Sequence, residues 1–159
     1  MEDMTSAAAP LAIADLYHVG LVVPDVGEAT GRLTAVSGYT WTKPVEAELT
    51  VTTRDGDVVM PFRFVYSIEA PHLEVIQEVP GTIWTANPDR SAHHLGYWTD
   101  DLGASCRALE GNGYRLEARP AGAELTSFAY LIDEAGVRIE LVDRALFPDW
   151  PGFLAMMAA

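Results

Sequence analysis

Residues 17–25 of the sequence, YHVGLVVPD, reappear in outline at residues 93–101, HHLGYWTDD. Aligned without gaps, the two stretches share a histidine, a glycine and an aspartate, which place His18 over His94, Gly20 over Gly96 and Asp25 over Asp101. Matches at one fixed separation indicate an internal repeat. The chain is therefore expected to contain two copies of one structural unit.

Two further pairs of stretches extend the repeat. Residues 62–66 (FRFVY) align with residues 128–132 (FAYLI), and residues 72–76 (HLEVI) align with residues 138–142 (RIELV). The last pair places Glu74 over Glu140. These pairs lie closer together than the first pair, so the first copy carries extra residues between its helix and its third strand.

Each copy shows the same order of expected elements. A strand of alternating character ends at Asp25 or Asp101, and an aspartate there can cap a helix because its carboxylate accepts hydrogen bonds from free backbone N–H groups. Helices are expected over residues 26–36 and 102–110. Strands are expected at residues 49–53, 58–66 and 72–77 of the first copy, and at 114–118, 127–132 and 137–142 of the second.

This order predicts an α+β protein made of two βαβββ modules. The modules are assigned to residues 14–79 and 92–143, with a flexible N-terminus at 1–13, a linker at 80–91 and an apolar C-terminal tail at 144–159. The tail holds several large apolar side chains, including Phe147, Trp150 and Phe153. It is expected to cover a cleft or a dimer partner, because a segment this apolar is costly to leave in water.

Composition limits the classes of partner. The sequence has 10 basic and 23 acidic residues and a net charge of −13, which repels nucleic acid and anionic membrane surfaces. Cys106 is the single cysteine, so neither an intrachain disulfide nor a multi-thiolate metal site can form. The start lacks the basic flank of a secretory signal, and no apolar run is long enough to span a bilayer. We expect a cytoplasmic protein that forms a homodimer and binds a small-molecule substrate.

The repeated histidines and glutamates fall on one face of their strands. Because strand side chains alternate between two faces, His18 and His94 each share a face with a following glycine, and Glu74 and Glu140 lie between apolar residues of the opposite face. The apolar faces suit packing against the helices. The faces with histidine and glutamate are therefore expected to line a second, concave surface.

A single metal ion would explain this duplicated set. A carboxylate in a half-buried strand is costly unless its charge is compensated, and one divalent cation can compensate two. Imidazole nitrogen with carboxylate oxygen suits Zn, Ni, Co, Mn or Fe. Any one of these residues taken alone is more simply explained as structural, whereas their recurrence at matched places favours a site.

With these residues in view, the chain resembles the vicinal oxygen chelate superfamily, which contains glyoxalase I, methylmalonyl-CoA epimerase, extradiol dioxygenases and antibiotic-binding resistance proteins. The resemblance covers both copies and is nearest to the glyoxalase I and epimerase branch. It implies that the paired modules curl into a barrel-like cleft. It assigns one divalent metal ion to His18, Glu74, His94 and Glu140, and not to His93, which is expected on the helix-packed side or at the start of its strand.

The resemblance also implies a reaction. A metal-dependent lyase or isomerase of this kind acts next to a carbonyl through an enediolate-type intermediate, with Glu140 as the first choice of base and Glu74 as the acid or base opposite. Two features depart from the relatives: residues 54–57 form a turn where epimerases carry an acidic stretch, and no cluster of basic residues for a glutathione or CoA tail is evident. A non-catalytic binding or antibiotic-resistance protein is one alternative, and a ring-cleaving dioxygenase is a second.

Candidate substrate contacts come from the same strand faces. Phe64 and Tyr130 lie on aromatic strand faces that either pack in the core or line a pocket. Trp98 shares the face of His94, and His72 and Arg138 each precede a glutamate on its face. The sequence therefore predicts substrate contacts from His72, Trp98, Arg138, Phe64 and Tyr130.

Overall fold

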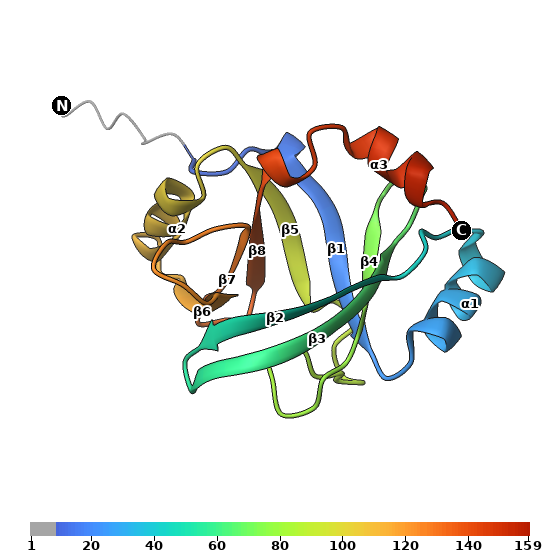
Figure 1. Ribbon diagram of the computed structural model, residues 1–159, viewed down its shortest axis with the longest axis horizontal. Coiled ribbons are helices and arrows are strands. Elements are labelled where there is room, and N and C mark those ends of the chain that lie inside the picture. The colour runs from blue at the N-terminus through green and yellow to red at the C-terminus, as the bar shows by residue number, and fades with distance from the viewer. Residues whose placement is uncertain (1–8) are drawn as a thin grey trace.

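Eight strands close into a barrel in the computed structural model, which describes residues 9–159 (Figure 1). The strands are β1 (Leu16–Val23), β2 (Val45–Thr53), β3 (Gly56–Tyr66), β4 (Leu73–Gln77), β5 (His94–Thr99), β6 (Arg115–Pro120), β7 (Phe128–Ile132) and β8 (Arg138–Asp143). Around the barrel they follow the order β1, β4, β3, β2, β6, β7, β8, β5. The four strands of each repeat thus stay together, and the expected α+β class is confirmed.

Three helices and two short 3-10 turns complete the described residues 9–159. They are α1 (Val26–Ser37), α2 (Leu102–Glu110) and α3 (Trp150–Met157), with η1 (Ile13–Asp15) and η2 (Arg144–Leu146). Asp25 accepts a hydrogen bond from the backbone of Glu28, and Asp101 accepts one from Ala104, so both aspartates cap their helices as expected. Helices α1 and α2 pack on the outer, apolar faces of their own strands, on opposite sides of the barrel (Figure 1).

The two repeats join along two seams. Strands β2 and β6 pair antiparallel at one seam, and β1 and β5 pair antiparallel at the other. On either side of the second seam, β1 runs parallel to β4 and β5 runs parallel to β8. The resulting register sets the candidate site residues across from glycines: His18 and Glu140 face Gly96, and His94 and Glu74 face Gly20.

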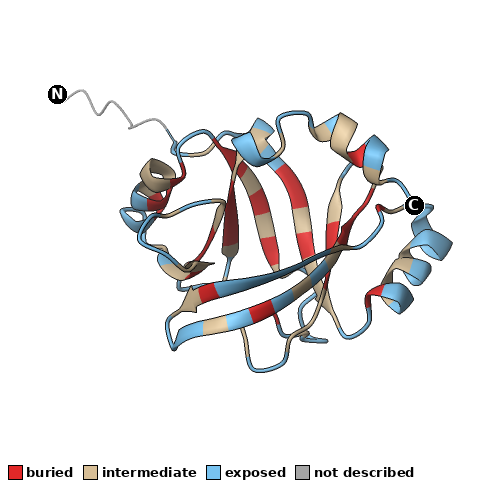
Figure 2. Ribbon diagram, in the orientation of Figure 1, coloured by how far each residue is buried: buried red, intermediate tan, exposed pale blue. Residues whose placement is uncertain are grey.

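The β2–β3 hairpin is longer than expected. Strand β2 begins at Val45, and its pairing with β3 runs without a break from Val45 opposite Phe64 to Thr53 opposite Gly56. Glu46 and Glu48 alternate with apolar residues in this added part and lie on its outer, exposed face. Figure 2 shows that buried residues concentrate on β1, β5 and β8, whereas β2 and α1 are largely exposed.

The apolar tail folds back onto the barrel. Asp149 accepts a hydrogen bond from the backbone of Gly152 and so caps α3. Trp150 packs edge-on against Tyr17 and Tyr66, at centroid distances of 5.2 and 4.9 Å. The tail therefore covers one end of its own barrel.

Residues 1–8 of the expected flexible N-terminus lie outside the described part of the chain. Within residues 9–159, no helix is both long and apolar enough to cross a membrane.

Candidate metal centre

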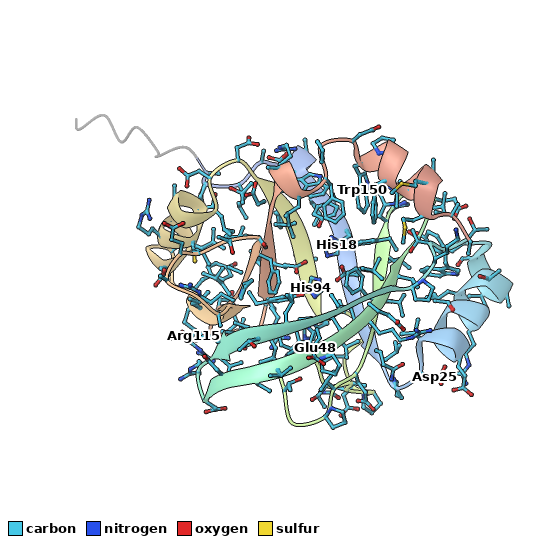
Figure 3. All side chains as sticks on the ribbon, viewed as in Figure 1. His18, Asp25, Glu48, His94, Arg115 and Trp150 are labelled. Carbon is cyan, nitrogen blue, oxygen red and sulfur yellow. The ribbon has the colours of Figure 1, made fainter. Side chains whose placement is uncertain are left out.

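Four strands bring the repeated histidines and glutamates together inside the barrel. His18 on β1, Glu74 on β4, His94 on β5 and Glu140 on β8 are all buried, and one ligand atom from each lies within 4.8 Å of the others. Figure 3 shows His18 and His94 side by side on the two adjacent strands that join the repeats. The set expected from the sequence is thus assembled in space.

The spacing of the ligand atoms fits a metal ion. The two Nε2 atoms of His18 and His94 lie 3.0 Å apart. The Nε2 atom of His18 is 3.6 Å from Oε1 of Glu74 and 3.2 Å from Oε1 of Glu140, and the corresponding distances from His94 are 3.3 and 3.5 Å. With metal–ligand bonds of about 2.1 Å, neighbouring ligands lie ~3.0 Å apart in an octahedron and ~3.4 Å apart in a tetrahedron. The set therefore suits a transition metal or zinc.

Some buried polar atoms of the group lack hydrogen-bond partners. Within residues 9–159, Oε1 of Glu74 and Oε1 of Glu140 are buried without a hydrogen-bond partner, and both face the centre of the group. Burial and the neighbouring Glu74 raise the pKa of Glu140 to about 8, and burial likewise raises the pKa of Glu74. Burial lowers the pKa of His94 to about 3. A divalent cation would supply the positive charge that compensates the two buried carboxylates.

Glycine at two positions makes room for the imidazole rings. A Cβ atom on Gly20 would lie 2.0 Å from Cε1 of His94, and a Cβ atom on Gly96 would lie 2.0 Å from Cε1 of His18. Each glycine therefore accommodates the histidine of the other repeat. The recurring spacing of histidine and glycine in the sequence reflects this reciprocal packing.

His93 lies immediately before β5, at the start of the strand as expected, and its ring contacts His94 of the ligand group. Its Nδ1 atom is 2.8 Å from Nδ1 of His94, and its Nε2 atom is 2.8 Å from the carbonyl oxygen of Ile83. A carbonyl only accepts, so Nε2 of His93 carries the proton and its Nδ1 accepts from His94. Nε2 of His94 is then unprotonated and free to bind a metal ion.

Local backbone geometry explains why alternation of faces does not assign His93 to either face of the strand. Its equivalent in the first repeat, Tyr17, sits at an irregularity where the pairing of β1 with β5 shifts between Leu16 and His18. His93 itself precedes the first residue of β5. Simple alternation of faces therefore fails at both positions. The adjacent pair of histidines was the available signal in the sequence.

Arg138 is held in an ion pair beside the site. Its Nε atom lies 2.6 Å from Oε2 of Glu117, and its Nη1 atom donates to the carbonyl oxygen of His93 at 3.2 Å. These bonds give Arg138 a role in fixing the backbone at His93. They do not place it in contact with a ligand at the carboxylates, as the sequence had suggested.

Trp98 and His72 pack under the C-terminal tail. Trp98 is buried and stacks on Tyr17 with ring centroids 3.5 Å apart. The ring of His72 is bonded to the carbonyl oxygen of Ser67 at 3.1 Å and lies edge-on to Trp150. Neither lines the cavity at the site, so their contacts are those of packing residues.

A cavity of about 160 Å³ opens beside the group. Glu74 and Glu140 form part of its wall. Phe64 and Tyr130, both expected as substrate contacts, also line it, together with Phe147 from the tail. The two carboxylates are thus reachable from the cavity. The lining by Phe147 was not foreseen, because strand alternation says nothing about where a tail returns.

Comparison with known proteins identifies the family. Residues 17–130 match the family described as the Glyoxalase/Bleomycin resistance protein/Dioxygenase superfamily. The chain belongs to this superfamily. The match spans most of both repeats, and the resemblance drawn from the repeated motifs is confirmed. No curated protein sequence matches the chain significantly.

Several solved structures share the fold at low sequence identity. The methylmalonyl-CoA epimerase of Mycobacterium tuberculosis is 20% identical, with a TM-score of 0.58 over 87% of this chain and 93% of the epimerase. A variant epimerase of Streptomyces coelicolor in complex with 2-nitronate-propionyl-CoA is 17% identical, with a TM-score of 0.57 over 81% and 96%. A hypothetical protein from Bacillus halodurans is 14% identical, with a TM-score of 0.56 over 80% and 92%. These likenesses establish the fold alone.

Proposed function

We propose that the protein is a metal-dependent lyase or isomerase that acts at a carbon next to a carbonyl group. One observation carries the proposal: two histidines and two glutamates converge beside a cavity whose wall includes both carboxylates. The bound ion would polarise the substrate carbonyl and so favour an enediolate-type intermediate. The protein is proposed to bind one such ion per site, chosen from Zn, Ni, Co, Mn and Fe.

The residues of the site have different proposed roles. His18 and His94 would bind as neutral imidazoles, and His93 keeps His94 in the required tautomer. Glu140 is proposed to remove the proton from the carbon beside the carbonyl, because its carboxylate lines the cavity. Glu74, on the neighbouring wall, is proposed to return a proton.

Hydrogen exchange tests the proposal without knowledge of the product. Loss of carbon-bound hydrogen to deuterated water would be followed by NMR in a panel of α-hydroxy ketones, including hydroxyacetone and 2-hydroxyacetophenone, with protein loaded with each metal. We expect metal-dependent exchange that Glu140→Gln abolishes, because the amide cannot accept the proton. Glu124→Gln, the same change at an exposed position, is the control and should leave exchange intact.

The alternatives give different results in the same experiment. Tight binding of panel members without exchange would indicate a binding or resistance protein. Oxygen uptake with a catechol would indicate a ring-cleaving dioxygenase. Either result would replace the proposed reaction.

We also propose that the working form is a cytoplasmic homodimer. Leu146 and Met156 in the tail remain 49% and 70% exposed in the single chain, so apolar surface is left for a second copy to cover. Light scattering coupled to gel filtration measures the mass directly, and a monomeric mass would contradict the dimer.

A further inference from the structure

The cavity beside the candidate metal centre has an apolar wall and a polar floor. Its wall comes from alternate residues of β2 and β3, from β7 and from the tail, and includes Phe62, Phe64, Phe128 and Phe147. The polar groups among the lining residues are the carboxylates of Glu74 and Glu140 and the hydroxyls of Tyr66 and Tyr130. All four lie on β3, β4, β7 and β8 at or next to the ligand group. A ligand can therefore meet polar groups at one end only.

Positive charge is missing where a charged ligand would need it. No lysine or arginine is among the residues that line this cavity. Two arginines on the strands that line the cavity are already paired: Arg63 on β3 with Glu46, and Arg138 on β8 with Glu117. Phosphate groups are held in proteins mainly by arginine, lysine or clusters of backbone N–H groups. This cavity is therefore unsuited to the phosphates of a nucleotide-bearing thioester.

The volume of the cavity is close to that needed to hold one aromatic ring. Its volume is about 160 Å³. An apolar protein cavity of about 150 Å³ is large enough to hold benzene. Phe62 and Phe128 stand edge to face at a centroid distance of 6.2 Å, and Phe128 and Tyr130 do so at 5.8 Å. Such a set of rings offers both edges and faces to a further ring.

We infer that the substrate of the proposed reaction is an uncharged compound with a single aromatic ring and two adjacent oxygens. The ring would occupy the phenylalanine-lined wall, and the two oxygens would point toward Glu74 and Glu140. This inference rests on the proposed function for the metal site, and it adds the identity of the substrate body. It also separates this protein from the solved epimerases, whose names specify CoA thioesters.

Two hydroxamates make a matched pair of probes. Benzohydroxamate and acetohydroxamate carry the same two adjacent oxygens, and only the first carries a ring. Each would be titrated calorimetrically into the nickel-loaded, full-length protein. We expect benzohydroxamate to bind at least about tenfold more tightly, because burying a phenyl ring in an apolar site is favourable. Propionyl-CoA at a hundredfold excess should not displace it.

A variant at the mouth of the cavity tests the position of the ring. Ala47→Phe on β2 adds a ring to the cavity wall, and Glu48→Phe adds the same side chain to the outer face of the same strand. We expect the first variant to reduce the affinity for benzohydroxamate to that for acetohydroxamate. The second variant should preserve the difference. Nickel content of both proteins should equal that of the parent.

The outcomes separate the substrate body from the metal site. Equal affinity for the two hydroxamates in nickel-loaded protein would overturn the aromatic substrate and leave the proposed metal site standing. Displacement of benzohydroxamate by propionyl-CoA would overturn the exclusion of thioesters. A protein that takes up no nickel and binds neither hydroxamate would overturn the proposed function and this inference together.

Discussion

His93 sets the protonation of a proposed metal ligand without contacting the metal position itself. The chain of bonds runs from the carbonyl of Ile83 through the ring of His93 to Nδ1 of His94. Burial and the neighbouring His94 lower the pKa of His93 to about 3, so the ring is neutral near pH 7 and carries a single proton. That proton faces Ile83, and the unprotonated side faces His94.

Replacement of His93 by phenylalanine should weaken metal binding. The ring would be kept, but His94 would lose the acceptor that fixes its tautomer, and loss of such a partner costs about 10–100-fold in metal affinity. The control is His72→Phe, because His72 is also half-buried and bonded to a carbonyl but lies outside the ligand group. Calorimetry gives the affinities, and ¹⁵N NMR of the metal-free protein gives the tautomer of His94. Unchanged affinity and tautomer in the phenylalanine variant would remove this role.

Alanine at Gly20 or Gly96 should disrupt the site from the opposite strand. In each case the added Cβ atom would overlap the imidazole of the other repeat, and that ring is buried. We expect at least about tenfold weaker metal binding and a loss of about 1–3 kcal/mol in the free energy of unfolding.

Gly31→Ala is the matched control for the glycine variants. Gly31 lies in α1, where a Cβ atom would meet nothing within 4 Å. The substitution should raise helix stability by up to about 1 kcal/mol and leave metal affinity unchanged. Metal affinity in Gly20→Ala equal to that in Gly31→Ala would show that the histidine rings do not need the space.

At the scale of elements, the strand pairing around β1 and β5 explains why the site sits where the repeats meet. Each of these strands pairs with the other and, in parallel, with the glutamate-bearing strand of its own repeat. The antiparallel register sets His18 opposite Gly96 and His94 opposite Gly20, and the Nε2 atoms of the two histidines lie 3.0 Å apart. Each repeat contributes one histidine and one glutamate to the ligand group, so the complete group requires both repeats.

Helix α3 contributes stability through Trp150. This side chain touches Tyr17, Tyr66 and Trp98, all of which are buried. Trp150→Ala should lower the free energy of unfolding by about 2–3 kcal/mol, since a large aromatic contact is lost. Val36→Ala on α1 is the control; Val36 is 80% exposed, and its replacement should change the free energy of unfolding by less than about 0.5 kcal/mol. Urea unfolding measures both, and equal midpoints would show that α3 is not docked.

For the whole molecule, the repeat predicts most of the fold and the ligand group. Two copies of one pattern place His18, Glu74, His94 and Glu140 on equivalent strands, and period-two alternation turns them inward. The same alternation is interrupted at Tyr17, where the pairing of β1 with β5 shifts, and it does not apply to His93, which lies before β5 begins.

Long-range packing is what the sequence does not predict. Trp98 is predicted to contact a ligand, and the structure adds that Phe147 and Trp150 of the returning tail pack against it. Hydrophobic pattern alone cannot distinguish a side chain packed under another segment from one that lines a cavity, because both positions are buried and apolar. The path of the tail and the shape of the cavity depend on contacts between residues distant in the chain.

Metal removal should destabilise the whole barrel, because the ion would connect four strands drawn from both repeats. Any ligand that binds the folded state alone stabilises it, by about 2.7 kcal/mol at a concentration a hundredfold above Kd. For a chain of 159 residues this corresponds to a rise of roughly 5–10 °C in Tm. Scanning calorimetry of chelator-treated protein, with and without Zn, Ni, Co, Mn or Fe(II), measures the shift.

Two comparisons make this last expectation specific to the proposed site. His18→Ala should abolish the metal-dependent rise in Tm, because the variant keeps one imidazole and both carboxylates but loses one of the four proposed ligands. Glu46→Gln, on the exposed face of β2, should retain the full rise, which excludes a general effect of cations on a protein of net charge −13. Elemental analysis should find one ion per chain in the parent protein. A rise in Tm that survives in His18→Ala, or that no metal produces in the parent, would contradict a metal centre at these four residues.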